Sequence, residues 1–247
     1  MVEKFEFHYT AMGENRRIHL YLPDEYEHTD ERYPVLYMFD GHNLFYDSDA
    51  AYGKSWGIRE YLDGWYKKMI VVGMEPGENR LSEFSPYDFS SRKWGKFQGM
   101  GDVTMQWIIN ELKPYIDSHY RTWWHREATA LAGSSMGGLM AFYGLMHYNQ
   151  YFSKAAAISP AVGFSIKEVK KELVNNTLWP DNRLFLSWGT REMSPRFNKT
   201  YGKNVELLEQ ATRYLGFRTQ ILRHENGTHC EACWEEEVPL WMPFLWE

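Results

Sequence analysis

The chain has 247 residues, of which 44% are hydrophobic, and a formal net charge of −6. A single α/β domain spanning residues 1–247 is expected, because a chain of this length can still be built around one hydrophobic core. The acidic balance and the lack of a basic stripe argue against a nucleic-acid partner. No apolar run reaches the ~20 residues of a membrane span, and the first residues do not resemble a signal segment. The sequence therefore predicts a cytoplasmic protein with no membrane partner.

The first half of the chain predicts an antiparallel hairpin followed by buried strands. Residues 3–9 and 15–22 alternate in polarity around a Gly-Glu-Asn turn at 13–15. Residues 33–39 and 69–74 are nearly continuous apolar runs, typical of strands covered on both faces, with a helix expected over 56–66. Residues 75–101 are long for a connection and rich in aromatic side chains, which predicts an ordered loop over a pocket.

The second half alternates strands with helices. Strands are expected over 129–132, 152–159, 183–188 and 217–223, and helices over 102–119, 139–147, 165–175 and 198–215. A last helix, over 230–246, is expected to be interrupted by Pro239 and Pro243. The alternation predicts an α/β fold with a mostly parallel central sheet, the N-terminal hairpin at its edge and helices on both faces.

The motif Gly133-x-Ser135-x-Gly137 lies between a predicted strand and a predicted helix. A nucleophile on such a sharp turn is held in a strained backbone conformation. Side chains two residues before and after it would clash, and glycine at both positions removes the clash. The turn exposes the hydroxyl and aims the next helix N-terminus at the reaction centre. Ser135 is therefore the predicted nucleophile.

A serine nucleophile needs a base, and the base needs an orienting acid. His229 follows the last predicted strand in a turn and is the predicted base, with His224 as the alternative. Glu192 follows the strand over 183–188 and gives the order serine, acid, histidine. If Glu192 is instead a surface carboxylate paired with a neighbouring arginine, a Ser–His dyad is the next hypothesis.

The remaining parts of the predicted site come from two loops. The backbone N–H groups of His42, in the segment after strand 33–39, and of Met136 are predicted to form an oxyanion hole. No metal site and no cofactor are expected. The predicted substrate contacts are Asn43, Tyr87, Trp94 and Phe97.

The only two cysteines, Cys230 and Cys233, form a C-x-x-C motif directly after His229. Their spacing places them on one face of a helical turn, which favours a role in helix packing. Redox or metal chemistry is the alternative, although two thiols and one imidazole do not complete a structural zinc site.

Several segments together resemble the putative-esterase family of the α/β-hydrolase superfamily. The resemblance rests on residues 133–138 (GSSMGG), 33–45 (YPVLYMFDGHNLF), 80–86 (RLSEFSP), 120–122 (YRT) and 159–161 (SPA). That family includes enterochelin-type siderophore esterases, carbohydrate feruloyl and acetyl esterases, S-formylglutathione hydrolase and mycolyltransferases. The resemblance implies the α/β-hydrolase fold, with Ser135 as nucleophile, Glu192 as acid and His229 as base. Many members place Asp where Glu192 stands, so the acid departs from the family's pattern.

The function predicted on these grounds is that of a serine esterase that forms and hydrolyses an acyl-enzyme on Ser135. The expected partner is a small-molecule ester, either a feruloyl or acetyl ester of a carbohydrate or a siderophore ester. Acyl transfer to an alcohol would use the same residues. A non-catalytic binding module on a hydrolase scaffold is the third hypothesis.

Overall fold

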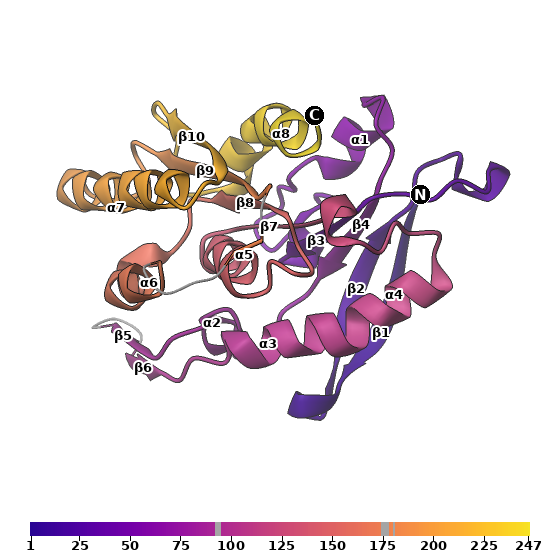
Figure 1. Ribbon diagram of the computed structural model, residues 1–247, viewed down its shortest axis with the longest axis horizontal. Helices are drawn as coiled ribbons and strands as arrows, with labels where there is room; N and C mark the ends of the chain where they lie inside the picture. Colours follow the sequence, from indigo (N-terminus) through magenta and orange to yellow (C-terminus); the bar gives the residue numbers. More distant parts are fainter. Residues whose placement is uncertain (92–94, 174–177, 180) are drawn as a thin grey trace.

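The computed structural model describes the chain except residues 92–94, 174–177 and 180. Its centre is an eight-stranded sheet with the strand order β1-β2-β4-β3-β7-β8-β9-β10. The strands are β1 (Val2–Tyr9), β2 (Glu14–Tyr21), β3 (Val35–Phe39), β4 (Ile70–Met74), β7 (Thr129–Ser134), β8 (Lys154–Ile158), β9 (Arg183–Gly189) and β10 (Arg218–His224). A separate two-stranded sheet consists of β5 (Phe89–Ser91) and β6 (Gly95–Phe97), which lie apart from the central sheet (Figure 1).

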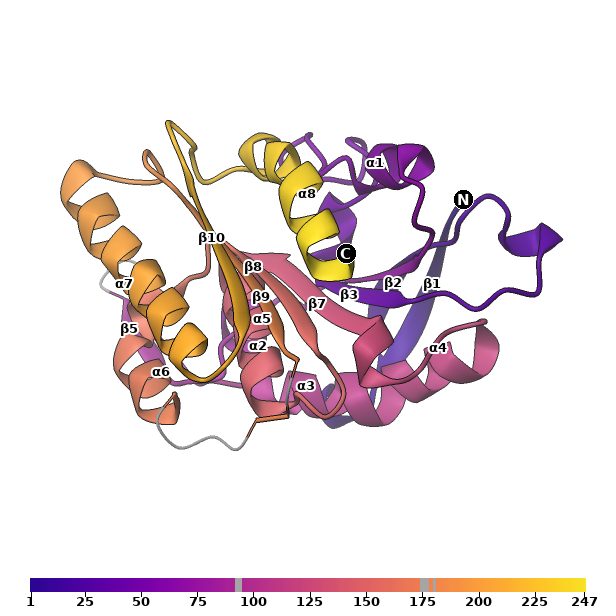
Figure 2. The ribbon, with the colours of Figure 1, turned by 45° about the horizontal axis from the view of Figure 1, so that its top comes forward.

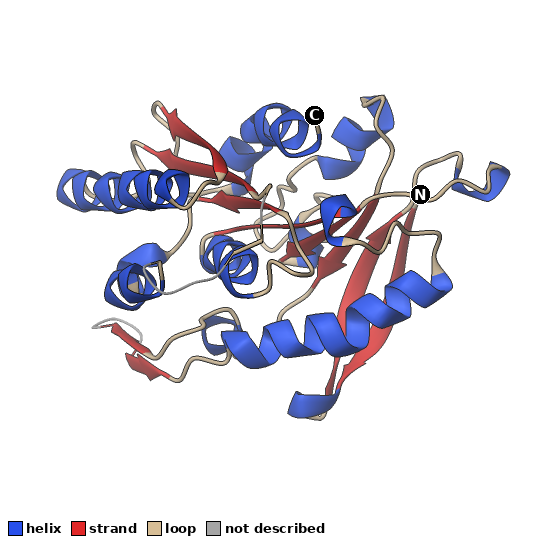
Figure 3. Ribbon diagram, viewed as in Figure 1, coloured by secondary structure: helices blue, strands red, loops and turns tan. Residues whose placement is uncertain are grey.

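The central sheet is mostly parallel, as the sequence predicts. β1 pairs with β2 and β2 with β4 in the antiparallel sense, and all other neighbouring strands in it run parallel. Every residue of β3, β4 and β7 is buried, which explains their continuous apolar sequences. β1 alternates in exposure because one of its faces meets solvent. Figure 3 shows the strands crossing the molecule between the helices.

Helices cover both faces of this sheet (Figure 2). One face carries α1 (Ile58–Gly64) and α8 (Glu231–Trp246), whose apolar side chains share a core cluster. The other face carries α3 (Gly101–Trp107), α4 (Lys113–His119), α5 (Met136–His147), α6 (Ile166–Glu172) and α7 (Pro195–Tyr214). In the part of the chain that the structure describes, no helix combines the length and apolar character needed to cross a membrane.

Two helices differ from their predicted form. The helix expected over 102–119 consists of α3 and α4 joined by a π-helical segment, Ile108–Leu112. The prediction that prolines interrupt the last helix was wrong, since α8 continues through Pro239 and Pro243. Pro239 is exposed and Pro243 is only partly buried, so the carbonyls that lose their helical partners can meet water. The opposite side of α8 stays anchored in the core, with Trp241 fully buried.

The long segment over 75–101 is ordered where it is described. It contains the short helix α2 (Arg80–Glu83) and the β5–β6 pair. Trp94 lies outside the described residues.

The parallel strands bring together segments that lie far apart in the chain. β3, β7, β9 and β10 all end at the same edge of the sheet, because each pairs in parallel with its neighbours. The residues that follow these ends include His42, Ser135, Glu192 and His229. In open α/β sheets, this edge is where active sites form.

Candidate active site

Ser135 occupies a sharp turn between β7 and α5. Its backbone angles are φ 56° and ψ −118°, a conformation that residues with side chains rarely adopt. A Cβ atom added to Gly133 would lie 2.7 Å from the backbone of Gly137, and one added to Gly137 would lie 2.9 Å from the Cβ of Phe39. The Ser135 N–H donates to the Ile158 carbonyl at 3.0 Å, which ties the turn to β8. The two glycines therefore leave no room for side chains, as the motif predicts.

His229 and Glu192 form a pair at the ends of β10 and β9. The His229 Nδ1 lies 2.9 Å from the Glu192 Oε2. The carboxylate is 2% exposed and its other oxygen accepts two hydrogen bonds, from the Gly189 N–H at 2.6 Å and from the Ser159 hydroxyl at 2.6 Å. Because a carboxylate with this many donors is fixed in place, it orients the imidazole.

Two residues that the sequence did not single out as functional support this pair. The Trp234 ring meets the His229 ring edge-on at 5.0 Å, and its Nε1–H donates to the Ser159 hydroxyl oxygen at 3.1 Å. Ser159 itself has a positive φ of 43°, and its hydroxyl donates to Glu192. Ser159 occurs in the 159–161 segment that resembles the esterase family, so a sequence signal for it existed.

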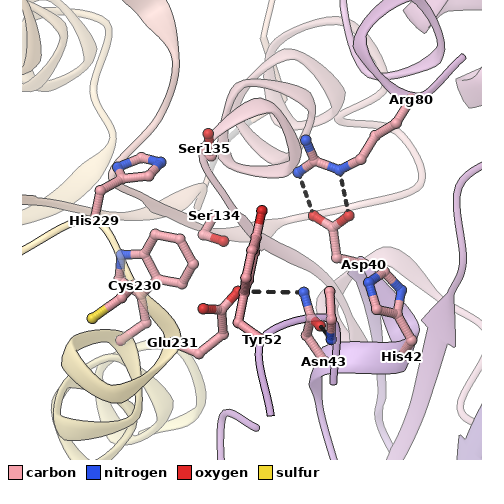
Figure 4. A pocket seen from close by; sticks show the side chains of 12 residues that line it. Asp40, His42, Asn43, Tyr52, Arg80, Ser134, Ser135, His229, Cys230 and Glu231 are labelled. Carbon is pink, nitrogen blue, oxygen red and sulfur yellow. Dashed lines mark hydrogen bonds and ion pairs between the residues drawn. The ribbon is translucent and has the colours of Figure 1, made fainter. Parts of the chain in front are cut away.

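His229 and Ser135 lie beside each other in one cavity (Figure 4). Within the described residues, no direct hydrogen bond joins the His229 ring to the Ser135 hydroxyl. Such contacts are often loose in a site without substrate and tighten when the ester binds.

The segment after β3 brings His42 to the same cavity. Asp40 has a left-handed backbone with φ 60°, and Gly41 packs so closely that an added Cβ would lie 2.5 Å from the carbonyl carbon of Gly73. Outside the regular helices and strands, no backbone hydrogen bond of the described residues is made by the N–H of His42 or of Met136. These are the two N–H groups that the sequence predicts for an oxyanion hole.

The cavity measures about 460 Å³ and carries three charged side chains. Arg80 donates to both carboxylate oxygens of Asp40, at 2.5 and 2.7 Å, so its charge is neutralised by its partner. Glu231 adds a second carboxylate, and burial raises the pKa of this group above its ordinary value. The described lining therefore holds two carboxylates and one guanidinium.

Of the predicted substrate contacts, the structure places Asn43 in this cavity. The Asn43 Oδ1 accepts from the Ala51 N–H at 2.9 Å, and its Nδ2 lies 3.4 Å from Glu231. Tyr52 also lines the cavity and is 85% exposed, although the sequence did not single it out.

Tyr87 and Phe97 lie elsewhere. The Tyr87 hydroxyl donates to Glu172 on α6, and its ring packs edge-on against Tyr143 of α5. Phe97 stacks on Phe89 at 4.9 Å in the β5–β6 pair. Neither side chain lines the cavity, because the aromatic residues of the long loop pack against helices and against each other.

The alternative base, His224, also lies outside the cavity lining. Its Nδ1 is 2.9 Å from the buried carboxylate of Glu237, and its Nε2 is 3.3 Å from Glu236. Both ring nitrogens of His224 therefore contact carboxylates of α8 and not groups of the cavity.

The sequence profile of the putative esterase family matches residues 10–237. The chain belongs to the putative esterase family. It is thus a carboxylic ester hydrolase, which confirms the predicted family and enzyme class.

Curated relatives of this esterase include an uncharacterized protein and two named esterases. YbbA of Bacillus subtilis is 27% identical over 181 residues, which span 72% of this chain and 69% of that protein. Esterase Rv1288 of Mycobacterium tuberculosis is 31% identical over 64% of this chain, and an endo-1,4-beta-xylanase/feruloyl esterase of Xylanibacter ruminicola is 27% identical over 94% of it. The aligned parts make up only 32% and 30% of these two longer relatives.

Solved structures share the fold of the esterase at low sequence identity. An IroE-like serine hydrolase from Shewanella oneidensis superimposes with a TM-score of 0.77 at 20% identity, covering 94% of this chain and 76% of that one. The siderophore hydrolase EstA from Aspergillus nidulans gives a TM-score of 0.75 at 18% identity, covering 96% and 93%. These likenesses confirm the predicted α/β-hydrolase fold.

Proposed function

We propose that the protein is a serine esterase in which Ser135 attacks the ester carbonyl and becomes acylated. The observation that carries the proposal is the contact of 2.9 Å between the His229 Nδ1 and the Glu192 carboxylate, because His229 lines the same cavity as the strained Ser135. A carboxylate at Nδ1 keeps the proton on that nitrogen and leaves Nε2 free to accept from a hydroxyl.

Acylation proceeds by proton transfers through His229. The imidazole takes the Ser135 proton as the hydroxyl oxygen bonds to the carbonyl carbon, and Glu192 stabilises the imidazolium that results. His229 then gives the proton to the alcohol oxygen as the ester bond breaks. The N–H groups of His42 and Met136 stabilise the negative charge that develops on the carbonyl oxygen.

Deacylation repeats these steps with water as the nucleophile. Water loses its proton to His229, attacks the acyl carbon, and releases the carboxylic acid from Ser135. An alcohol in place of water would give acyl transfer through the same residues. Adding methanol or glycerol to the assay and measuring transesterified product separates hydrolysis from transfer.

The lining charge favours a neutral, hydroxyl-rich alcohol over a strongly anionic one. Asp40 neutralises Arg80, and Glu231 leaves the cavity with an excess of negative charge above the raised pKa of its carboxyl. Like charges disfavour a multiply anionic ferric siderophore, whereas carboxylates accept hydrogen bonds from sugar hydroxyls. The Xylanibacter relative, whose name includes feruloyl esterase, supports feruloyl or acetyl carbohydrate esters as the substrate class. Siderophore esters are the second candidate, supported by the fold of the Aspergillus siderophore hydrolase.

The catalytic assignment is tested by labelling with a serine-directed fluorophosphonate and by turnover of p-nitrophenyl acetate. The wild type is expected to be labelled on Ser135, and Ser135→Ala is expected to lose the label and at least about 10³-fold in kcat/KM. His229→Ala should lose a similar factor, while His224→Gln, whose ring lies outside the cavity, should keep the rate. Equal labelling of wild type and Ser135→Ala would refute the proposal.

The substrate class is tested by comparing methyl ferulate, acetylated xylan, a catecholate trilactone and S-formylglutathione. The carbohydrate-type esters are expected to give the highest kcat/KM. A preference for the trilactone would favour the siderophore alternative.

A further inference from the structure

The proposed mechanism uses neither cysteine, although both lie at the edge of the candidate active site. Cys230 directly follows His229 and precedes the first residue of α8, and Cys233 lies in the first turn of that helix. Both thiols are free and half-buried, so solvent reaches them. Cys230 lines the catalytic cavity, and its sulfur points away from Ser135 (Figure 4).

The two sulfurs are neighbours. The Thr228 hydroxyl oxygen lies 3.2 Å from the Cys230 Sγ and 3.4 Å from the Cys233 Sγ. The Thr228 N–H also donates to the Cys233 Sγ at 3.3 Å, and the Cys233 N–H donates to the Cys230 carbonyl at 3.2 Å. One short turn thus holds both thiols around a single hydroxyl group.

The surroundings of Cys230 favour a reactive thiolate. Burial by itself raises the pKa of this thiol, but hydrogen bonds from Thr228 and Cys233 outweigh it and lower the pKa below its ordinary value. The N-terminus of a helix also favours negative charge. In the described part of the chain, no group of three or more His, Cys, Asp or Glu side chains is placed to hold a metal ion. The pair is therefore better suited to thiol chemistry than to metal binding.

The same turn is linked to the proposed catalytic pair, His229 and Glu192, by the backbone and by side-chain contacts. Cys230 is bonded to His229 through the backbone, and Trp234, one residue after Cys233, packs edge-on against the His229 ring at 5.0 Å. Trp234 also donates to Ser159, which in turn donates to Glu192. A shift of the backbone at the start of α8 would therefore alter the positions of both His229 and Glu192.

We propose that Cys230 and Cys233 form a redox-active dithiol that closes to an intramolecular disulfide by exchange with a low-molecular-weight disulfide, and that closure slows ester hydrolysis. The Cys230 thiolate attacks one sulfur of the small disulfide, whose S–S bond breaks and releases one thiolate. The Cys233 thiolate then attacks the Cys230 sulfur and releases the second. The dithiol loses two electrons and two protons, and the small disulfide is reduced to two thiols.

Closure slows the reaction because it tightens the turn that carries His229. The sulfurs must leave Thr228 and approach to the ~2.05 Å of an S–S bond, which draws Cys230 toward Cys233. A misplacement of about 1 Å in a catalytic group can lower a rate by about 10²-fold. Only this second part of the inference, the effect on rate, rests on the proposed function.

The test incubates the full chain with oxidised and reduced glutathione at several ratios, alkylates the remaining thiols, and measures intact mass and kcat/KM. Because the chain has two cysteines, the mass reports on this pair alone. The expected result is loss of both alkylation sites without an adduct, with kcat/KM about tenfold lower and restored by dithiothreitol. Cys233→Ser is the matched control, expected to keep the basal rate, to resist inactivation by closure and to hold a glutathione adduct on Cys230.

Three results would overturn the inference: thiols that remain alkylatable at every ratio, a lasting glutathione adduct in the wild type, or closure with an unchanged kcat/KM. The mass readout does not depend on ester hydrolysis. If the disulfide forms but the protein has no esterase activity, the proposed function is contradicted, whereas the inference that Cys230 and Cys233 are a redox-active dithiol is still supported.

Discussion

Glu192 accepts three hydrogen bonds, and each of them restricts a different motion of the carboxylate. The Gly189 N–H ties it to the end of β9, the Ser159 hydroxyl ties it to the end of β8, and His229 uses the second oxygen. Because the side chain is 2% exposed, water does not compete for these positions. At the scale of single residues, the carboxylate is held ready before any substrate binds, which is the preorganisation that an orienting acid requires.

Glu192→Gln is expected to lower kcat by about 10²–10⁴-fold with little change in KM. The neutral amide fits the same space but cannot stabilise the imidazolium, and its NH₂ group opposes a proton on Nδ1. The measurement is steady-state hydrolysis of p-nitrophenyl acetate, with circular dichroism to show that the variant is folded. A loss under about tenfold would favour the Ser–His dyad over the triad.

At the scale of elements, the loop after β3 depends on a close approach of two backbones. Gly41 faces Gly73 of β4, and a Cβ at Gly41 would lie 2.5 Å from the Gly73 carbonyl carbon and 2.8 Å from the Met74 nitrogen. Neither obstacle is a flexible side chain. The position of His42 in the cavity is therefore set by how closely this loop can approach the sheet.

Gly41→Ala is expected to lower the free energy of unfolding by roughly 1–3 kcal/mol and to lower kcat/KM, because relief of the overlap moves the His42 N–H. Gly64→Ala in α1 is the matched control, since a Cβ there meets nothing within 4 Å. The control should be neutral or slightly stabilising. Urea unfolding and kinetics on both variants test this, and an unaffected Gly41→Ala enzyme would contradict it.

The elements that local patterns define were predictable from the sequence. The hairpin followed from period-2 alternation, the buried strands from apolar runs, and the sharp turn at Ser135 from two glycines around a serine. That Glu192 and His229 lie close together was predictable from the parallel topology alone, because both follow strands whose carboxyl ends lie at the same edge of the sheet.

Contacts between loops were not predictable in this way. Arg80 pairs with Asp40 across 40 residues, and Asn43 approaches Glu231 across 188. No periodicity in the sequence encodes such pairs, because they depend on how two loops fold back over the sheet edge. The same reason explains why Tyr87 and Phe97 look like pocket residues in sequence but pack away from the cavity.

At the scale of the whole molecule, the edge of the sheet opposite the cavity carries a buried cation. Lys154 begins β8 and is 9% exposed. Its Nζ donates to the Glu127 carbonyl and to the Ser153 hydroxyl oxygen at 3.0 Å, and lies 5.2 Å from the centre of the Trp246 ring. Burial and, secondarily, the charge of Arg183 lower the pKa of Lys154 from 10.5 to about 8.

This pKa makes stability depend on pH in a defined direction. Between pH 8 and 10.5, the unfolded chain binds a proton on Lys154 that the folded protein has released, so folding becomes more favourable as pH rises through this window. Below pH 8 the folded protein keeps a buried charge, at a cost of about 3 kcal/mol relative to the unfolded chain.

Lys154→Met removes this pH dependence of stability, so the free energy of unfolding of the wild type should rise by about 2 kcal/mol relative to that of the variant between pH 7 and 9.5. Urea unfolding at the two pH values measures the gain, with Lys167→Met on the exposed side of α6 as the control that should track the wild type. Because Lys154 does not line the candidate active-site cavity, kcat/KM at a fixed pH should stay unchanged. Parallel pH profiles of stability for wild type and Lys154→Met would contradict the lowered pKa.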